Sequence, residues 1–182
     1  MFTLSEIATA LSRAPNRAAD EERNAVRLKG LAQTRVLNIA NAAPGRKQRR
    51  KVDLEEACVA SIFVVLFDFG LTGHDFTKLR VGLQPQPEWT DAGSHIAEVA
   101  ELTCRGEEWV HDITISIDGT GERSLVGYLR RSTDEPVQVR QESALREFRA
   151  AQNIVVVGNT VLNLNGFLPH VVRHLHELTG DA

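Results

Sequence analysis

A nearly uninterrupted apolar run from Ala57 to Phe69 constrains the fold of this chain more than any other stretch. Its only polar residues are Ser61 and Asp68. Asp53 stands before it in the position of an N-cap, and two glutamates follow in the first turn, where the helix dipole favours negative charge. A helix that is apolar nearly all round must be covered by the rest of the fold or by a second subunit. We therefore expect this run to be a buried helix.

The segment directly before this helix is the most basic in the chain. Within six residues it contains five cations, with only Gln48 between them. Such a run has to stay in water, because burying even one unpaired charge is very costly. Most charge runs are solvated loops, but a cationic loop fixed to a core helix is well placed to bind a polyanion. The five cations are Arg46, Lys47, Arg49, Arg50 and Lys51.

Charge is unevenly divided along the 182 residues, although the net charge is only −3. Residues 1–53 contain eleven lysines and arginines against five acidic residues, a net of +6, and the remainder carries −9. The hydrophobic content of 42% and the charged content of 25% are ordinary for a folded protein. A basic first third followed by an acidic remainder favours a nucleic-acid-binding part joined to a separate body.

The sequence gives no sign of export or membrane insertion. Cys58 and Cys104 are far apart and neither belongs to a CxxC pair, so nothing indicates an oxidising compartment. The first fifteen residues lack the cationic and long apolar segments of a signal peptide. The apolar run is also far shorter than the ~20 residues of a membrane span. We expect a cytoplasmic protein with no membrane contact.

Two short helices separated by a tight break are expected at the N-terminus. The spacing of apolar residues predicts a first helix over residues 4–11. Pro15 lies in the break, and a second helical stretch follows over residues 17–29, with Gly30 in a C-cap position. Two helices in this arrangement predict a helix-turn-helix whose second helix reads DNA.

A helical wheel divides the second stretch into two sides. We expect the side with donors for base edges to face outward, because Arg pairs with guanine and Asn pairs with adenine in the major groove. The expected base-reading residues on that side are Arg17, Asn24 and Arg27. The opposite side consists of Ala19, Glu22, Val26 and Lys29.

The segment between this helix and the apolar helix predicts a β-wing. Residues 34–39 have the β-branched and apolar content of a short strand, and residues 41–45 indicate a turn by their Asn, Pro and Gly. Residues 48–52 return as a second strand. A wing with a cationic tip contacts phosphates or enters the minor groove. Arginine-rich runs also occur in peptides that bind structured RNA, so that alternative stays open.

After the apolar helix, Gly70 marks an end and Thr72 can cap another short helix. This order of elements resembles the DNA-binding half of the MerR family. The resemblance covers residues 1–80 and is carried by Val52-Asp53-Leu54, by Gly70-Leu71-Thr72 and by the segment His74-Asp75-Phe76-Thr77-Lys78-Leu79. The second helix lacks the Tyr-Tyr-Glu-like run of the family, and the wing lacks its tyrosines. The resemblance implies the architecture and a groove-reading role, but not metal sensing or promoter untwisting.

The C-terminal half has a different pattern. Residues 82–89 contain two prolines and no periodicity, which indicates a linker. Beyond it the sequence predicts an α+β unit of four or five strands. Its expected elements are a helix over residues 96–102, a strand over 109–117 with a hairpin partner over 122–130, a second hairpin of residues 154–157 and 160–164, and a last helix over 167–178.

The sequence contains no GxSxG, P-loop, HExxH or CxxC motif. His170 and His174 on the last helix have the i, i+4 spacing of metal ligands. A third convergent ligand is missing, so an ordinary surface or interface helix is favoured. His111 and Asp112 point to opposite faces of a strand and form no dyad. We expect no enzyme activity, no metal and no cofactor.

Together these patterns predict a mainly α N-terminal winged helix-turn-helix plus a small α+β C-terminal domain. The expected units are residues 1–81 for DNA binding, a linker at 82–89, and residues 90–182 for dimerisation or for a small-molecule or protein effector. The expected partner is double-stranded DNA, bound by a homodimer because two half-sites double the contacts. One face of the apolar helix is a candidate dimer contact. The expected function is transcription regulation; a phage-type architectural DNA binder (excisionase or terminase small subunit) and a protein-interaction module are the alternatives.

Overall fold

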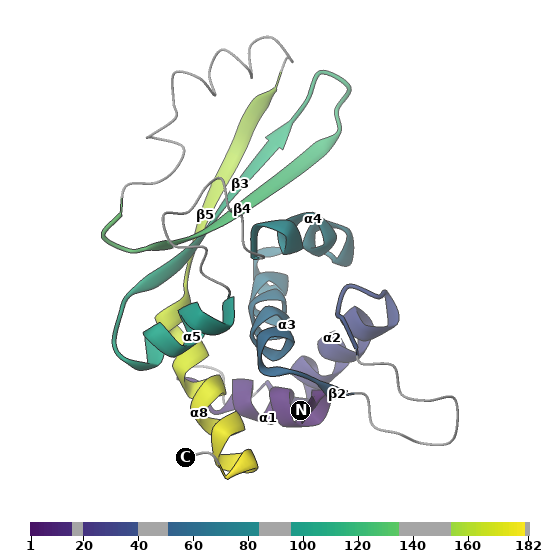
Figure 1. The fold of residues 1–182 in the computed structure, drawn as a ribbon. Coiled ribbons are helices and arrows are strands. Elements are labelled where there is room, and N and C mark those ends of the chain that lie inside the picture. Colours follow the sequence, from purple (N-terminus) through teal and green to yellow (C-terminus); the bar gives the residue numbers. More distant parts are fainter. Residues whose placement is uncertain (16–19, 40–50, 84–95, 135–153, 181–182) are drawn as a thin grey trace.

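The computed structural model of the chain describes residues 1–15, 20–39, 51–83, 96–134 and 154–180. In these ranges the fold is mixed and mostly helical, with six helices and two small antiparallel sheets. Most helices gather around α3, and three long strands extend away from them (Figure 1). The elements are β1 (Phe2–Thr3), α1 (Leu4–Ser12), α2 (Glu21–Gln33), β2 (Lys51–Val52), α3 (Leu54–Leu66), the 3-10 turn η1 (Phe67–Phe69), α4 (Gly73–Leu83), α5 (Ile96–Cys104), β3 (Trp109–Ile117), β4 (Arg123–Arg131), β5 (Val155–Asn163), the 3-10 turn η2 (Leu164–Gly166) and α8 (Leu168–Thr179).

Helix α1 begins where the sequence supplies a capping box. The Thr3 hydroxyl accepts the Glu6 N–H at 3.3 Å, and the Glu6 carboxylate accepts the Thr3 N–H at 2.6 Å. These bonds satisfy N–H groups that a helix start otherwise leaves open. Ile7, Ala8 and Leu11 are buried. The predicted first helix and its apolar face are confirmed.

The apolar helix α3 forms the centre of the molecule. The Asp53 carboxylate caps it by accepting the Glu56 N–H at 2.8 Å, and every residue from Glu56 to Leu66 is buried. Helices α1, α2, α4, α5 and α8 all pack against it. The predicted buried helix is confirmed, but its faces are occupied within one chain, which corrects the expectation that one of them is a dimer contact. Within the described ranges, α3 and the other helices are all too short or too polar to cross a membrane.

Helix α4 folds back on α3 as the sequence predicts. Gly70 ends the preceding turn with a φ of 76°, a left-handed value that glycine tolerates best. The Thr72 N–H then donates to the Asp75 carboxylate at 2.8 Å at the start of α4. Phe76 stacks on Phe63 with ring centroids 4.8 Å apart. An aromatic pair of this kind adds about 0.5–1.5 kcal/mol beyond its burial, so it fixes α4 against α3.

Three antiparallel strands form the larger sheet in the order β4-β3-β5. Strands β3 and β4 are the predicted hairpin, with Trp109 opposite Arg131. Because β3 is central, Trp109 to Thr114 are all buried rather than alternating. The second hairpin predicted within residues 154–164 is wrong, since β5 is one strand that continues through Gly158-Asn159 and pairs with β3. Main-chain bonding to a long neighbouring strand outweighs the Gly-Asn turn signal.

One hydrophobic core runs through both predicted domains. It contains Leu11 and Leu28 from residues 1–81 together with Val99 and Leu175 from residues 90–182. Helix α8 packs against α1 and α3, and α5 packs against α3 (Figure 1). Most of the predicted linker lies outside the described ranges. The division into two domains stays a prediction, but the two halves share their interior.

The two predicted wing strands are not paired with each other. β2 is the end of the second predicted strand, but its partner is β1, with Phe2 opposite Val52. Residues 34–39 form a turn and an irregular segment, so the strand expected there is wrong. Residues 40–50, which include the predicted turn at 41–45, lie outside the described ranges.

A buried ion pair explains this irregular segment. Glu56, which is 4% exposed, accepts hydrogen bonds from both Nη atoms of Arg80 on α4 and from the Asn38 N–H at 2.8 Å. Arg80 also donates to the Val36 carbonyl at 2.8 Å. Side chains therefore form hydrogen bonds with the Asn38 N–H and the Val36 carbonyl, which a strand would use to bond a neighbouring strand. The hydrogen bond with Glu56 raises the pKa of Arg80, and the bridge ties the chain after α2 to α3 and α4.

Breaking this bridge should destabilise the fold. We expect Arg80→Met to lower the free energy of unfolding by about 3–5 kcal/mol, because it leaves the buried Glu56 carboxylate without its cation. Adding Glu56→Gln should recover part of the loss, because the unpaired charge is then removed. Arg105→Ala, which breaks an exposed 4.0 Å pair with Glu101, should change the value by less than about 0.5 kcal/mol. Urea denaturation measures all three; equal losses in the single and double variants would contradict this account.

His111 lies on the face of the sheet that meets α4. The residue is fully buried, and neither ring nitrogen has a hydrogen-bond partner in the structure. A Cβ at Gly127 on the neighbouring strand would lie 2.3 Å from Nε2, so the glycine leaves room for the ring. Burial lowers the pKa of His111 to about 4, because a charged imidazole would lose its hydration. His111 is a neutral core residue.

Acid should weaken the fold through this residue. Unfolded, His111 binds a proton near its ordinary pKa of 6.5, whereas in the fold it does so only near pH 4. Between these values the unfolded state binds more protons, so stability is full above about pH 6.5 and falls by about 1.4 kcal/mol per pH unit on acidification. His111→Leu should remove this component. We expect the difference in unfolding free energy between wild type and variant to follow that slope in urea denaturation; a constant difference would show that His111 titrates normally.

Candidate nucleic-acid interface

Helix α2, the predicted DNA-reading helix, spans Glu21–Gln33. The helix expected over residues 17–29 exists, but it is displaced toward the C-terminus. Gly30 lies inside it instead of at its C-cap. The helix continues because Leu31 and Ala32 are buried in the core, and this packing outweighs the weak helix propensity of glycine.

The predicted outward side of α2 faces the core. Asn24 has no exposed surface, and its side-chain amide has no hydrogen-bond partner. Leu28 and Leu31, one and two turns later, are also fully buried or nearly so. At 100° per residue the three positions fall within about 60° of one another. The expectation that Asn24 faces outward toward a base is wrong, because the apolar stripe decides which side of the helix is buried.

Arg27 is held against the end of α3. Its Nη1 lies 2.8 Å from the Asp68 carboxylate and donates to the Val64 carbonyl at 3.2 Å. The guanidinium also lies 5.3 Å from the centre of the Phe67 ring. A guanidinium bonded and stacked in this way anchors one helix to another. Arg27 is therefore a packing residue, which corrects the expectation that it is available to a base.

A different row of residues on α2 faces solvent. These residues recur at helical spacing on the side opposite the core, and all are exposed. They are Glu22, Val26, Lys29 and Gln33. Val26 is 66% exposed, while Lys29 and Gln33 carry donors that suit phosphates or base edges. We call these four residues the α2 ridge.

Arg35 follows α2 in a strained backbone conformation. Its φ of 60° is the one positive value at a non-glycine residue in the described ranges. The Val36 N–H bonds the Leu31 carbonyl at 3.1 Å, which is the bond of a Schellman C-cap with Arg35 in the position that glycine usually takes. A left-handed arginine costs about 1–2 kcal/mol. Its side chain is exposed, so the packing of the fold does not account for an arginine here.

The predicted basic run is described only at its last residue. Lys51 is exposed on β2, opposite Thr3 of β1. The other predicted contact residues lie in ranges 16–19 and 40–50, outside the described residues, and their role stays a prediction. They are Arg17, Arg46, Lys47, Arg49 and Arg50.

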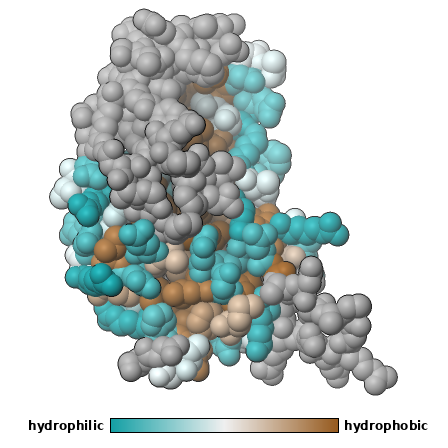
Figure 2. All heavy atoms as spheres, viewed as in Figure 1, coloured by the Kyte–Doolittle hydropathy of each residue, from teal (hydrophilic) through white to brown (hydrophobic). Residues whose placement is uncertain are grey.

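The described cations around α2 fall into two groups. In the first, Nη1 of Arg13 lies 2.8 Å from Nδ1 of His174, and Arg23 and Arg27 pair with Asp68. In the second, the side chains are exposed and make no hydrogen bond or ion pair in the described part of the chain; they are Lys29, Arg35 and Lys51. Figure 2 shows hydrophilic side chains projecting at the right of the molecule, where α2 ends. The first group holds helices together, and the second is available to an anion.

The two ends of α2 differ in charge. Glu21 and Glu22 are exposed in the first turn, and Glu21 accepts the Thr9 hydroxyl at 2.7 Å. Carboxylates at this end repel phosphates, whereas the C-terminal end carries Lys29 and Arg35. The C-terminal half of the helix and the turn after it are therefore the part that suits a nucleic acid.

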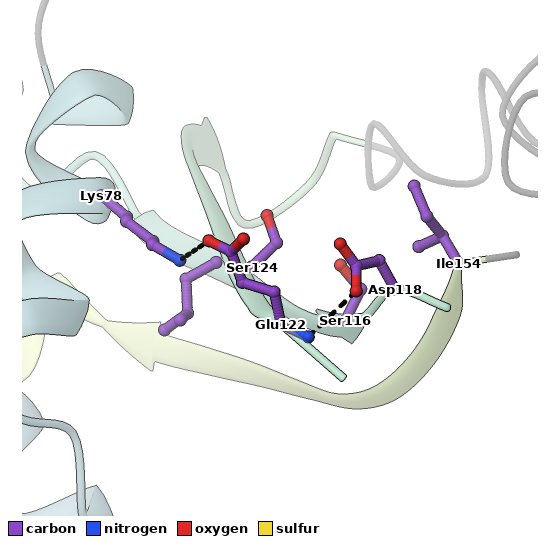
Figure 3. A pocket seen from close by; sticks show the side chains of 7 residues that line it. Lys78, Ser116, Asp118, Glu122, Ser124 and Ile154 are labelled. Atoms are coloured by element: carbon purple, nitrogen blue, oxygen red, sulfur yellow. Dashed lines mark hydrogen bonds and ion pairs between the residues drawn. The ribbon is translucent and has the colours of Figure 1, made fainter. Parts of the chain in front are cut away.

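A polar hollow of about 420 Å³ lies beside the β3–β4 hairpin (Figure 3). Lys78 of α4 reaches toward it, and its Nζ lies 3.4 Å from the Glu122 carboxylate and donates to the Arg123 carbonyl. Asp118 accepts the Thr120 hydroxyl and the N–H groups of Thr120 and Glu122. These bonds lower the pKa of Asp118. The charged groups of this hollow are therefore used in bonds that link α4 to the hairpin or close the hairpin turn.

A second hollow, of about 440 Å³, lies between α5 and α8, with Cys104, Arg173 and His176 in its lining. It is the candidate place for the predicted effector of the C-terminal half. His174 does not line this hollow; it is buried beside Arg13 at the end of α1. Across the described ranges no group of three or more His, Cys, Asp or Glu side chains could hold a metal ion.

Comparison with known proteins assigns no family to this chain. No protein-family model matches it, and no curated protein matches it. The resemblance to the MerR family therefore depends on the sequence pattern alone, and function has to come from the chemistry of the exposed residues.

Replacing the strained arginine should stabilise the fold. We expect Arg35→Gly to raise the free energy of unfolding by about 1 kcal/mol, because glycine adopts the left-handed conformation without the clash of a Cβ. Lys29→Gly, at an exposed position in the interior of α2, should lower it by about 1 kcal/mol. Urea denaturation of both variants measures the two signs. A loss of stability in Arg35→Gly would mean that the side chain itself supports the fold.

Proposed function

We propose that this protein binds double-stranded DNA as a winged helix-turn-helix regulator of transcription. The C-terminal half of α2 and the turn after it lie in the major groove. The basic run that ends in Lys51 grips neighbouring phosphates or the minor groove. Lys29, Gln33 and Arg35, rather than Asn24 and Arg27, supply the donors there: the two cations to phosphates beside the groove and Gln33 to base edges.

The separation of the cations into two groups is the observation that supports this proposal best. Arg23 and Arg27 are bonded to the protein, while Lys29, Arg35 and Lys51 are exposed and have no partner within the described residues. Arg35, one of the exposed cations, has a left-handed backbone conformation that costs about 1–2 kcal/mol at a non-glycine residue. Strain of this size at an exposed side chain is typical of functional sites.

The frame behind these cations is held by helix packing and ion pairs, which favours binding. Helices α1, α2 and α3 pack on one another, and β2 leads directly into α3. Arg27 fixes α2 to Asp68, and Arg80 fixes the chain after α2 to Glu56. Fixed main chain leaves only the side chains to be ordered by a ligand, so little of the binding energy is lost to conformational entropy.

The salt dependence of DNA binding tests the proposal. The probe is a labelled random-sequence duplex of about three helical turns, with affinity measured by fluorescence anisotropy between about 50 and 200 mM salt. The affinity of the wild type should fall steeply with salt, because each neutralised phosphate releases condensed counterions. Combined alanine replacement of Lys29, Arg35 and Lys51 should reduce the slope of log K against log salt by about 2–3. Replacement of Arg49, Arg50 and Lys51 should flatten it similarly.

The matched control removes the same charge from the other half of the chain. Arg105, Arg123 and Arg131 are exposed, and their combined replacement by alanine should leave the slope unchanged. An equal effect in the control and the test variant would exclude this interface. Failure to bind any duplex at low salt would favour a protein-interaction module. A footprint that tiles adjacent sites would favour the architectural class over a regulator that protects one site.

A further inference from the structure

The two edge strands of the larger sheet differ sharply in charge. β4 carries Arg123, Arg130 and Arg131, and α4 packs against it. β5, on the other edge, has no charged residue and no proline in its nine residues. The uncharged stretch continues on both sides of the strand, from Ile154 to Pro169. Figure 1 shows β4 and β5 on opposite sides of β3.

Within the described residues no strand pairs with the outer edge of β5, and three of its valines are exposed. Val155, Val157 and Val161 are 62%, 54% and 56% exposed. Among the described elements β5 packs mainly against β3. Natural proteins protect edge strands with charges, prolines, bulges, short length or a covering element, because an unprotected edge pairs with another strand. A register shift near Val157 is the one irregularity along its pairing with β3, and the strand is regular through Val161.

We propose that β5 pairs antiparallel with β5 of a second copy of this chain, which joins the two three-stranded sheets across a two-fold axis. A second copy fits this edge because two identical uncharged strands meet without any like-charge contact, and a two-fold interface uses the same surface on both sides. Because β5 has no charged residue, it has no group that would attract a charged partner. Exposed valines from both strands then lie near one another and leave water.

The edge of β5 supplies an exposed apolar surface for dimerisation, which α3 does not. The faces of α3 are occupied within one chain, so a dimer needs another apolar surface. The proposal does not depend on DNA binding, because it rests on the sheet alone. An interface without charge also predicts a dimer whose dissociation constant changes little with salt, in contrast to a nucleic-acid complex.

Sedimentation equilibrium of the full chain tests the proposal. The wild type should be a dimer, and Val161→Lys should raise the dimer dissociation constant about 100-fold or more, because the two-fold axis brings two lysines into one interface. Asn159→Lys, on the same face of the strand, should act in the same direction. Val126→Lys places the same charge on the same sheet face at the opposite edge, since both Val126 and Asn159 lie opposite Thr114. It should leave the dimer intact.

Thermal unfolding by circular dichroism shows which variants are folded, and all three substituted positions are exposed enough for lysine to be tolerated. A monomeric wild type would overturn the proposal. A dimer that survives both Val161→Lys and Asn159→Lys would overturn it as well, as would a dimer that Val126→Lys dissolves equally. None of these measurements contains DNA, so their outcome is separate from that of the proposed function.

Discussion

The burial of α3 on every side is the constraint on which the rest of the structure depends. A helix that cannot face water needs neighbours around its whole circumference. α1, α2 and α4 supply part of that cover, and α5 and α8 supply the remainder. Apolar burial stabilises by about 25 cal/mol per Å², so removing either set of neighbours would expose a large unfavourable surface. The C-terminal helices are consequently part of the frame that holds α2, and a ligand that moved them would act on α3 directly.

The two ends of α3 fix the position of α2 with the same arrangement of charge, a carboxylate that binds an arginine. At the N-terminal end, Glu56 binds Arg80 and holds the chain that leaves α2. At the C-terminal end, Asp68 binds Arg27 from the middle of α2. Charged groups that are paired and hydrogen-bonded within the fold specify one arrangement of the helices, because any other leaves a costly unpaired charge. The same pairing removes Arg27 from contact with a ligand and leaves the α2 ridge exposed.

Sequence reasoning succeeds where one local signal decides and fails where two compete. The cap at Asp53 and the apolar content of α3 are local signals, and both were predicted correctly. The exposed side of α2 was misread because Asn24 is polar but lies in line with Leu28 and Leu31; extending the helix through Gly30 to Leu31 would have completed that stripe. The strand expected over residues 34–39 failed because Glu56 and Arg80, distant in sequence, take its backbone groups. The sequence predicts two strands in place of β5, with a turn at Gly158-Asn159, because a local turn signal contains no information about the long partner strand β3.

The exposed cations on and just after α2 and the uncharged edge of β5 share one property. Packing within the fold explains the residue types of neither surface. Both retain features that are unfavourable to an isolated monomer, since Arg35 is strained and the valines of β5 contact water. The two proposed interactions differ in their dependence on salt, because phosphate binding weakens with salt whereas apolar pairing does not. If β5 provides the two-fold axis, the shared core transmits its symmetry to α2, and two ridges are held at a fixed separation. Half-site spacing would then be set by the length of the sheet and the packing of α3, and not by any residue that touches DNA.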